Sequence, residues 1–207
     1  MPPPKVFGVG FMKTGTTSLG RALEVLGYRV KGPFGLTDPT IAETGLETAL
    51  QLATECDAVQ DNPWCILYRE LDQHFPGSKF ILTLRPVDQW LGSVTRHFGY
   101  RTSPLRAWVF GEGRPKGNEA LYARRYADHT AAVRHYFQDR PEDLLILRLT
   151  EGDGWAQLCP FLNVPIPPVD FPWANDTTTR RRLRIRRYLR NPVASLTTLY
   201  RSYIGGY

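Results

Sequence analysis

The segment that most constrains the fold runs from residue 6 to residue 19 and reads VFGVGFMKTGTTSL. It joins an apolar, strand-like stretch to a helix-like one, and between them Gly10 and Gly15 have the spacing G-x-x-x-x-G. A glycine loop in this place presents successive backbone N–H groups at a helix N-terminus, where they bind an anion. A triphosphate-binding loop continues after its second glycine with lysine, whereas here Thr16 follows and the lysine comes earlier, as Lys13. The segment therefore predicts an anion-binding loop that does not use ATP in the ordinary way.

Apolar runs and helix-like stretches alternate along the chain to about residue 149, which favours a parallel sheet covered on both faces. The length of 207 residues fits a single domain, residues 1–207. We therefore predict a three-layer α/β fold with about five strands. The predicted strands are 5–9, 28–30, 58–60, 79–84 and 144–149, and the predicted helices are 17–26, 44–54, 64–74, 86–98 and 118–138.

Composition and charge exclude several classes of protein. With 42% hydrophobic and 22% charged residues, the chain is typical of a soluble globular protein. It contains no apolar run of the roughly 20 residues that cross a bilayer, and the first five residues show no secretory signal. The three cysteines match neither a disulfide framework nor a zinc pattern. We expect a cytoplasmic protein.

The net charge of +6 is concentrated at the C-terminus. Residues 174–207 contain eight arginines and one acidic residue, a net charge of +7, so the rest of the chain has a net charge of −1. A nucleic-acid-binding domain usually has its basic residues on the folded body, so no nucleic-acid partner is expected. The basic segment could instead contact an anionic membrane surface or an acidic acceptor.

Two motifs give the chain a resemblance to a known family. The first, K-T-G-T-T-S-L at residues 13–19, fits the pattern K-[ST]-G-T-[ST]-x-L. The second places Arg85 at the end of an apolar strand and Ser93 eight residues later, on the next helix. Together they resemble the sulfotransferases that use 3′-phosphoadenosine 5′-phosphosulfate (PAPS), and residues 75–93 are similar to the compact bacterial members.

The resemblance implies a P-loop kinase-like fold with strand order 2-3-1-4-5. It also implies transfer of a sulfuryl group from PAPS to a hydroxyl or amine of a small-molecule, glycan or lipid acceptor, without a metal. Arg85 and Ser93 would hold the 3′-phosphate. The 5′-phosphosulfate would be bound by Lys13, Thr14, Gly15, Thr16, Thr17 and Ser18.

Transfer of a sulfuryl group places two demands on the site. Negative charge grows on the leaving phosphate, and Lys13 lies where it would stabilise that charge. A general base should also remove the acceptor proton. Asp61 follows a short apolar strand and is the first candidate, although a shift of one residue would put Gln60 there, and Asp61 could instead cap the next helix. His97 is the second candidate base.

Two segments allow alternative interpretations. Residues 99–117 could form a lid whose aromatic side chains line an acceptor pocket, or an ordinary loop with its aromatics in the core. Residues 175–182 could help to bind the 3′-phosphate, or belong to a solvated basic helix. Neither segment identifies the acceptor.

Two other functions remain open at this stage. One is a small-molecule kinase that uses ATP, which requires a lysine after Gly15 and an acidic magnesium ligand. The other is a non-catalytic protein that binds anions, nucleic acid or membranes. Preference for a 3′-phosphorylated nucleotide over ATP would separate the sulfotransferase from both.

Overall fold

The structure is a computed structural model that describes residues 4–174 of the chain. By its internal contacts the chain divides into two units, Met1–Pro172 and Trp173–Tyr207. All helices and strands described below belong to the first unit. Of the basic segment 174–207, the structure describes only residue 174. The stretch 175–182, which was predicted as a possible 3′-phosphate contact, therefore lies outside the described residues.

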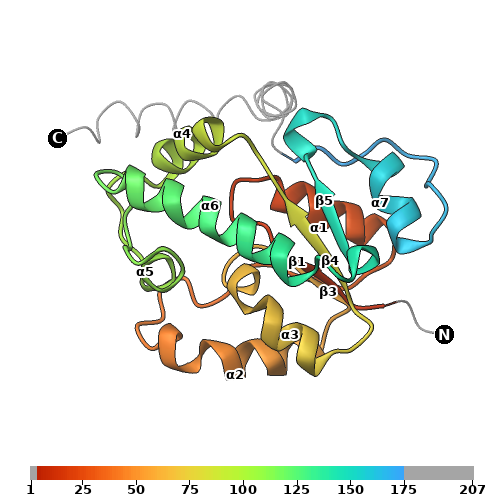
Figure 1. The fold of residues 1–207 in the computed structure, drawn as a ribbon, viewed down its shortest axis with the longest axis horizontal. Coiled ribbons are helices and arrows are strands. Elements are labelled where there is room, and N and C mark those ends of the chain that lie inside the picture. Colours follow the sequence, from red (N-terminus) through yellow and green to blue (C-terminus); the bar gives the residue numbers. More distant parts are fainter. Residues whose placement is uncertain (1–3, 175–207) are drawn as a thin grey trace, which may run out of the picture. The chain divides into compact units, whose positions relative to one another are not determined.

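The described elements follow the predicted alternation of strands and helices (Figure 1). The strands are β1 (Val6–Gly8), β2 (Val30–Lys31), β3 (Ala58–Val59), β4 (Lys79–Thr83) and β5 (Leu144–Leu147). The α-helices are α1 (Thr16–Val25), α2 (Ile41–Thr54), α3 (Tyr68–His74), α4 (Val87–Phe98), α5 (Pro104–Phe110), α6 (Glu119–Tyr136) and α7 (Trp155–Leu162). Short 3-10 helices are η1 (Trp64–Leu67), η2 (Pro141–Asp143) and η3 (Leu149–Glu151).

The strands form one parallel sheet in the order β2-β3-β1-β4-β5. This confirms the predicted α/β class and the predicted order 2-3-1-4-5. Strands β2 and β3 lie on one side of β1, and β4 and β5 lie on the other. The order in which strands are added to the sheet therefore switches sides at β1. Ligands of open parallel sheets bind at such a switch, outside the carboxyl ends of the strands.

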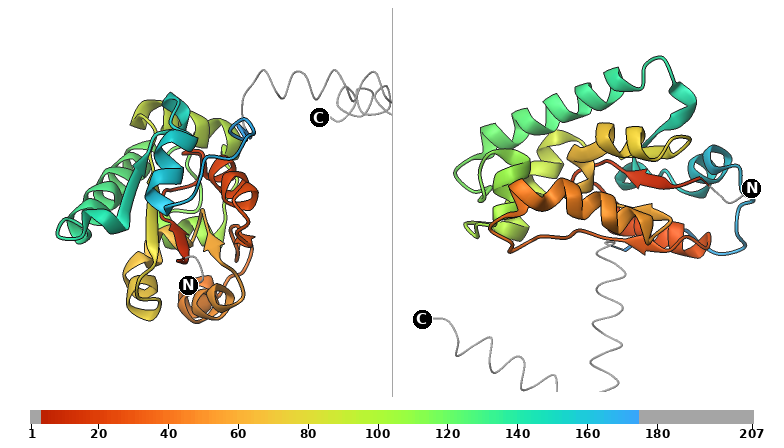
Figure 2. Two further views of the ribbon diagram at one scale, coloured as in Figure 1. Left: turned by 90° about the vertical axis from the view of Figure 1, so that its right-hand side faces the viewer. Right: turned by 90° about the horizontal axis from the view of Figure 1, so that it is seen from below.

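Side chains of the central strands alternate between the two faces of the sheet. Helices cover both faces (Figure 2). Phe7 and Phe80 pack in a cluster with residues of α2, α3, α4, α5 and α6. Val6 and Ile81 point to the other face, where they pack with residues of α1 and α7. Burial on both sides explains why these strands read as continuous apolar runs. The fold therefore has the three predicted layers.

Two helices were missed by the sequence pattern. Residues 99–117 contain α5, which packs its buried Phe110 into the larger cluster, and α7 includes Pro160 within its last turn. The buried guanidinium of Arg106 binds the carbonyls of Arg101 and Gly113 and so ties this excursion together. Movement of the segment as a lid stays a prediction, as does the single-domain boundary.

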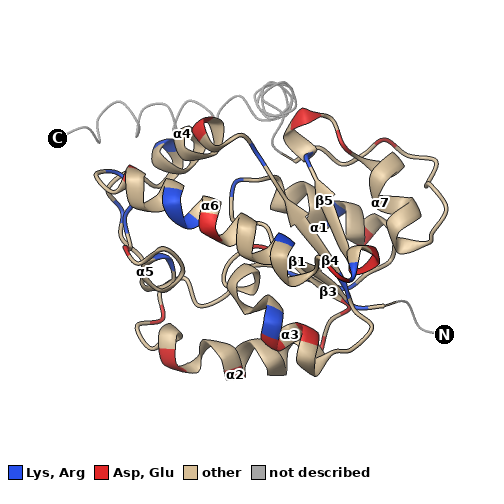
Figure 3. Ribbon diagram, viewed as in Figure 1, with Lys and Arg blue, Asp and Glu red and all other residues tan. Residues whose placement is uncertain are grey.

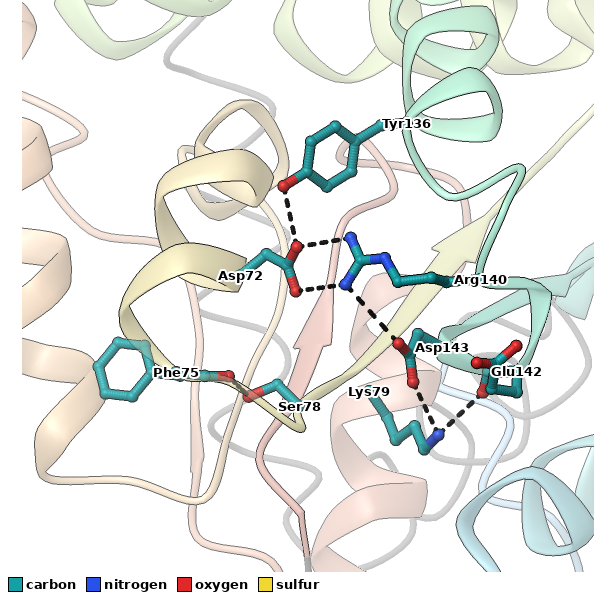
Figure 4. A network of polar contacts seen from close by, with 8 residues as sticks. All are labelled: Asp72, Phe75, Ser78, Lys79, Tyr136, Arg140, Glu142 and Asp143. Carbon is teal, nitrogen blue, oxygen red and sulfur yellow. Dashed lines mark hydrogen bonds and ion pairs between the residues drawn. The ribbon is translucent and has the colours of Figure 1, made fainter.

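A network of polar contacts joins α3, β4, η2 and the end of α6 at the amino-terminal edge of the sheet (Figure 4). Asp72 accepts two hydrogen bonds from Arg140 and one, at 2.8 Å, from the hydroxyl of Tyr136. Arg140 also contacts Asp143, which pairs with Lys79 at 2.9 Å. Lys79 is the first residue of β4, so this network lies at the opposite edge of the sheet from the glycine loop.

No helix among residues 4–174 combines the length and the apolar character that crossing a bilayer requires.

Candidate functional site

The glycine loop connects the end of β1 to the start of α1. Gly10 passes so close to β4 that a Cβ atom there would lie 2.0 Å from Oγ1 of Thr83, and therefore only glycine fits. Gly15 is the N-cap of α1, with φ of 109°, and Lys13 also has left-handed backbone, with φ of 69°. For a residue other than glycine, left-handed backbone costs free energy. The first turn of α1 directs N–H groups without intrahelical acceptors out of the loop, as the sequence predicts.

The predicted hydroxyl donors of the loop differ in what they contact. Thr14 is fully buried, and its hydroxyl lies 2.6 Å from both the carbonyl of Phe11 and the hydroxyl of Thr83. Its observed contribution is to hold the loop in shape. Thr17 is exposed, and Ser18 is buried. Contact of these groups with a phosphosulfate stays a prediction.

Asp61 follows β3 and lies against the loop. Its Oδ2 accepts a 2.6 Å hydrogen bond from the Thr16 hydroxyl, and its Oδ1 accepts one at 2.7 Å from the N–H of Asn62. Its backbone is left-handed, with φ of 79°. Burial raises the pKa of this carboxyl, against the opposing effects of the two hydrogen bonds and of the charge of Lys13. Asp61 is thus a recessed carboxylate at the carboxyl edge of the sheet.

The sequence left two alternatives to Asp61 as the base at this strand end: Gln60 could take its place, or Asp61 could cap the next helix. Within the described part of the chain no side chain caps the 3-10 helix that begins at Trp64, and the residue at its N-cap is Pro63. Asp61 uses its carboxylate on the loop and on its own neighbour instead. The side chain of Gln60 lies beside Gly20 and Gly32. Asp61, and not Gln60, is therefore the residue that meets the glycine loop.

Arg85 lies half-buried just beyond β4, at the same edge of the sheet. Its Nε is buried and has no hydrogen-bond partner within residues 4–174. A buried guanidinium nitrogen without a partner is costly, so this nitrogen is suited to an anionic ligand. Ser93 is half-buried two turns into α4.

Arg148 was missed by the sequence reasoning. It directly follows β5, and Thr83 of β4 pairs with Leu147 of β5, so Arg148 and Arg85 lie one and two residues beyond paired positions on neighbouring strands. Figure 3 shows basic residues beyond the carboxyl ends of β4 and β5 and in the loop after β1. The predicted strand 144–149 included Arg148, whereas β5 ends at Leu147, so the signal that could have found Arg148 was the end of the apolar run directly before it. Cationic residues at this edge therefore include Arg85, Arg148 and Lys13.

Helix α4 also contacts the loop. The indole N–H of the buried Trp90 donates a 2.8 Å hydrogen bond to the carbonyl of Met12, next to Lys13. His97, the second candidate base, lies two turns further along α4, exposed, with its ring against Phe98. Asp61 is bonded to the loop itself, so its position favours it over His97.

His129 of α6 was assigned no role from the sequence, because its partners are far away along the chain. Its Nε2 lies 2.8 Å from the carbonyl of Val9, to which it must donate, and its ring packs 4.3 Å from that of Phe11. Burial lowers the pKa of His129 to about 4, and the charge of Arg125 acts in the same direction, against the effect of the Val9 hydrogen bond. His129 therefore stays neutral at pH 7 and fixes the start of the loop.

The low pKa of His129 predicts a loss of stability in acid. An unfolded histidine takes up a proton below pH 6.5, whereas His129 in the folded state takes one up only below about pH 4, so acidification through this range favours unfolding. We expect the wild type to lose about 2–3 kcal/mol more than His129→Gln between pH 7 and pH 4.5. Urea denaturation at both pH values measures this. Equal losses in the two proteins would show that His129 does not titrate this way.

Within residues 4–174, no three His, Cys, Asp or Glu side chains come together as a metal site would require.

Comparison with known proteins agrees with this arrangement. The sequence model of a protein family, the sulfotransferase domain, matches residues 5–112 and 102–180 of this chain. The matched residues include the glycine loop, Asp61, Arg85 and Ser93. A curated relative, Ava biosynthesis cluster protein M of Aspergillus versicolor, is 26% identical over 211 residues, covering 81% of this chain and 79% of its own length.

Proposed function

Since the chain belongs to the sulfotransferase domain family, we propose that it transfers a sulfuryl group from PAPS to a hydroxyl or amine of an acceptor. One observation carries the choice of donor. A loop suited to one phosphate lies at the same edge of the sheet as the buried Nε of Arg85, which has no hydrogen-bond partner within residues 4–174. PAPS has two phosphate positions, whereas ATP has its phosphates on one chain. Two separate cationic anchors fit the first donor better.

The residues present fit this donor in their chemistry. The first-turn N–H groups of α1 and Lys13 would bind the 5′-phosphosulfate, and Arg85 with Ser93 would bind the 3′-phosphate. Arginine offers a rigid fork of donors for a dianionic phosphate. When bound, PAPS supplies an activated sulfuryl group. The three cysteines are free buried thiols, which fits the cytoplasmic location that we propose.

Lys13 and Asp61 would have complementary tasks in the reaction. Lys13 would stabilise the negative charge that develops on the phosphate as its bond to sulfur breaks. The Asp61 carboxylate would accept the proton of the acceptor hydroxyl as the new O–S bond forms. Burial raises the pKa of Asp61, which makes its carboxylate a stronger base than an exposed one. His97 remains the alternative base in this proposal.

The acceptor is proposed to be a small molecule rather than a glycan or lipid. The relative from Aspergillus versicolor is named as a biosynthesis cluster protein, and this name supports the choice of a small molecule. A phenol is therefore a reasonable surrogate acceptor. Contact of the basic segment 174–207 with a membrane is a separate proposal, and it is not needed for the transfer reaction.

An exchange assay tests the proposed function. Enzyme, 4-nitrophenyl sulfate and adenosine 3′,5′-bisphosphate are mixed, and sulfuryl transfer to the 5′-phosphate releases coloured 4-nitrophenolate. Release should require the 3′,5′-bisphosphate and should not occur with AMP in its place. Release at the same rate without any nucleotide would contradict the proposal, because a simple sulfatase would then explain it.

A further inference from the structure

The hydroxyl of Tyr126 makes two hydrogen bonds to one residue. It accepts from the backbone N–H of Arg85 at 2.9 Å and donates to the backbone carbonyl of the same residue at 2.8 Å. Tyr126 comes from α6, 41 residues further along the chain, and the residue is 7% exposed. The clamp therefore fixes the main chain of Arg85 at the point where β4 has ended and α4 has not begun.

The ring of Tyr126 connects this clamp to the glycine loop. It lies 4.5 Å from the ring of Trp90, whose indole N–H binds the carbonyl of Met12 in the loop. One turn further along α6, His129 binds the carbonyl of Val9. One face of α6 thus fixes both the loop and Arg85, the residues that we propose for the two phosphates of the donor.

Arg85 has no side-chain hydrogen bond among residues 4–174 to hold its guanidinium, and its Nε is buried without a partner there. Its direction is therefore set by its own main chain, which Tyr126 holds. We propose that Tyr126 is a positioning residue that gives the site its selectivity for a 3′-phosphorylated nucleotide. This proposal rests on the proposed function, because it assumes that Arg85 binds the 3′-phosphate.

The Tyr126→Phe variant removes the hydroxyl and keeps the ring contact with Trp90. The readout is the ratio of dissociation constants for AMP and adenosine 3′,5′-bisphosphate, measured by calorimetry on the full chain. We expect the wild type to prefer the bisphosphate by ~100-fold, and Arg85→Ala to abolish this preference. Tyr126→Phe should lower it by ~10-fold and leave the affinity for AMP unchanged.

Tyr122→Phe is a matched control, because Tyr122 is a buried tyrosine one turn earlier on α6 whose hydroxyl binds the carbonyl of Glu112. It should keep the wild-type ratio. In an Arg85→Ala background, Tyr126→Phe should change the ratio no further, as expected for a residue that acts through Arg85.

The proposal is overturned if Tyr126→Phe keeps the wild-type ratio, or if it weakens both nucleotides equally, since the hydroxyl would then be merely structural. A wild type with no preference for the bisphosphate over AMP would instead overturn the proposed function, so the two failures are distinguishable. A ratio that falls further on Tyr126→Phe in the Arg85→Ala background would also contradict action through Arg85.

Discussion

Replacing Lys13 with alanine is expected to lower turnover by ~10²–10³-fold while weakening binding of adenosine 3′,5′-bisphosphate by less than ~10-fold. The difference follows from when the charge appears. The bisphosphate carries an ordinary 5′-phosphate, whereas additional charge develops on that phosphate only as the S–O bond breaks. Lys13 has its backbone in the strained left-handed region inside the loop, a conformation that proteins retain where function needs it.

Measuring turnover in the exchange assay and bisphosphate affinity by calorimetry separates these two effects. Lys116→Ala is the matched control, because Lys116 is an exposed lysine whose ammonium lies over the ring of Tyr100. It should leave both quantities unchanged. Equal losses of turnover and of affinity in Lys13→Ala would mean that Lys13 binds the nucleotide and does not act in the transfer step.

The second large effect is expected from Asp61→Asn, with a loss of turnover of ~10²-fold or more and little loss of stability. Asparagine tolerates the left-handed backbone of this position. Its amide oxygen can still accept a hydrogen bond from Thr16, but its NH2 group cannot accept the second one, from the N–H of Asn62. The change therefore removes the base and keeps the shape of the side chain, with the loss of one hydrogen bond. Because burial raises the pKa of Asp61, the wild-type rate should rise with pH through that raised value, and the variant should lose this rise.

Asp57→Asn is the control for Asp61→Asn, since Asp57 precedes the same strand and pairs with Arg29 at the opposite edge of the sheet. It should keep full turnover. A fully active Asp61→Asn would leave Asp61 a structural partner of Thr16 and would make His97 the base to test next.

The parallel sheet was predictable because each strand is a short apolar run that alternates with helix-like stretches, whereas the order of its strands was predicted from the family resemblance. Two helices, α5 and α7, were not predicted from the sequence. Ser103 caps α5, Pro104 begins it and Gly111 ends it, signals that the many glycines and arginines of residues 99–117 obscured. Helix α7 contains Pro160, which removes a helical hydrogen bond, and the predicted alternation of strands and helices extended only to about residue 149.

The residues that support the site were harder to predict than those that line it. Lys13 and Arg85 belong to short motifs, so local spacing identifies them. Tyr126 and His129 act on residues 41 and 120 positions away, and no local pattern carries such contacts. Their helical spacing of three places them on one face of α6, but only the tertiary fold shows that this face meets both the loop and Arg85.

The most direct test of the central claim is a thermal-shift titration of the full chain with three ligands. Adenosine 3′,5′-bisphosphate at 1 mM should stabilise the protein by ~4 kcal/mol if its Kd is about 1 μM, a shift in Tm of ~10 °C. ATP with Mg²⁺ and duplex DNA, at matched concentrations, should produce much smaller shifts. A protein that is stabilised by ATP with Mg²⁺ or by DNA, and not by the bisphosphate, would contradict the assignment of PAPS as the donor.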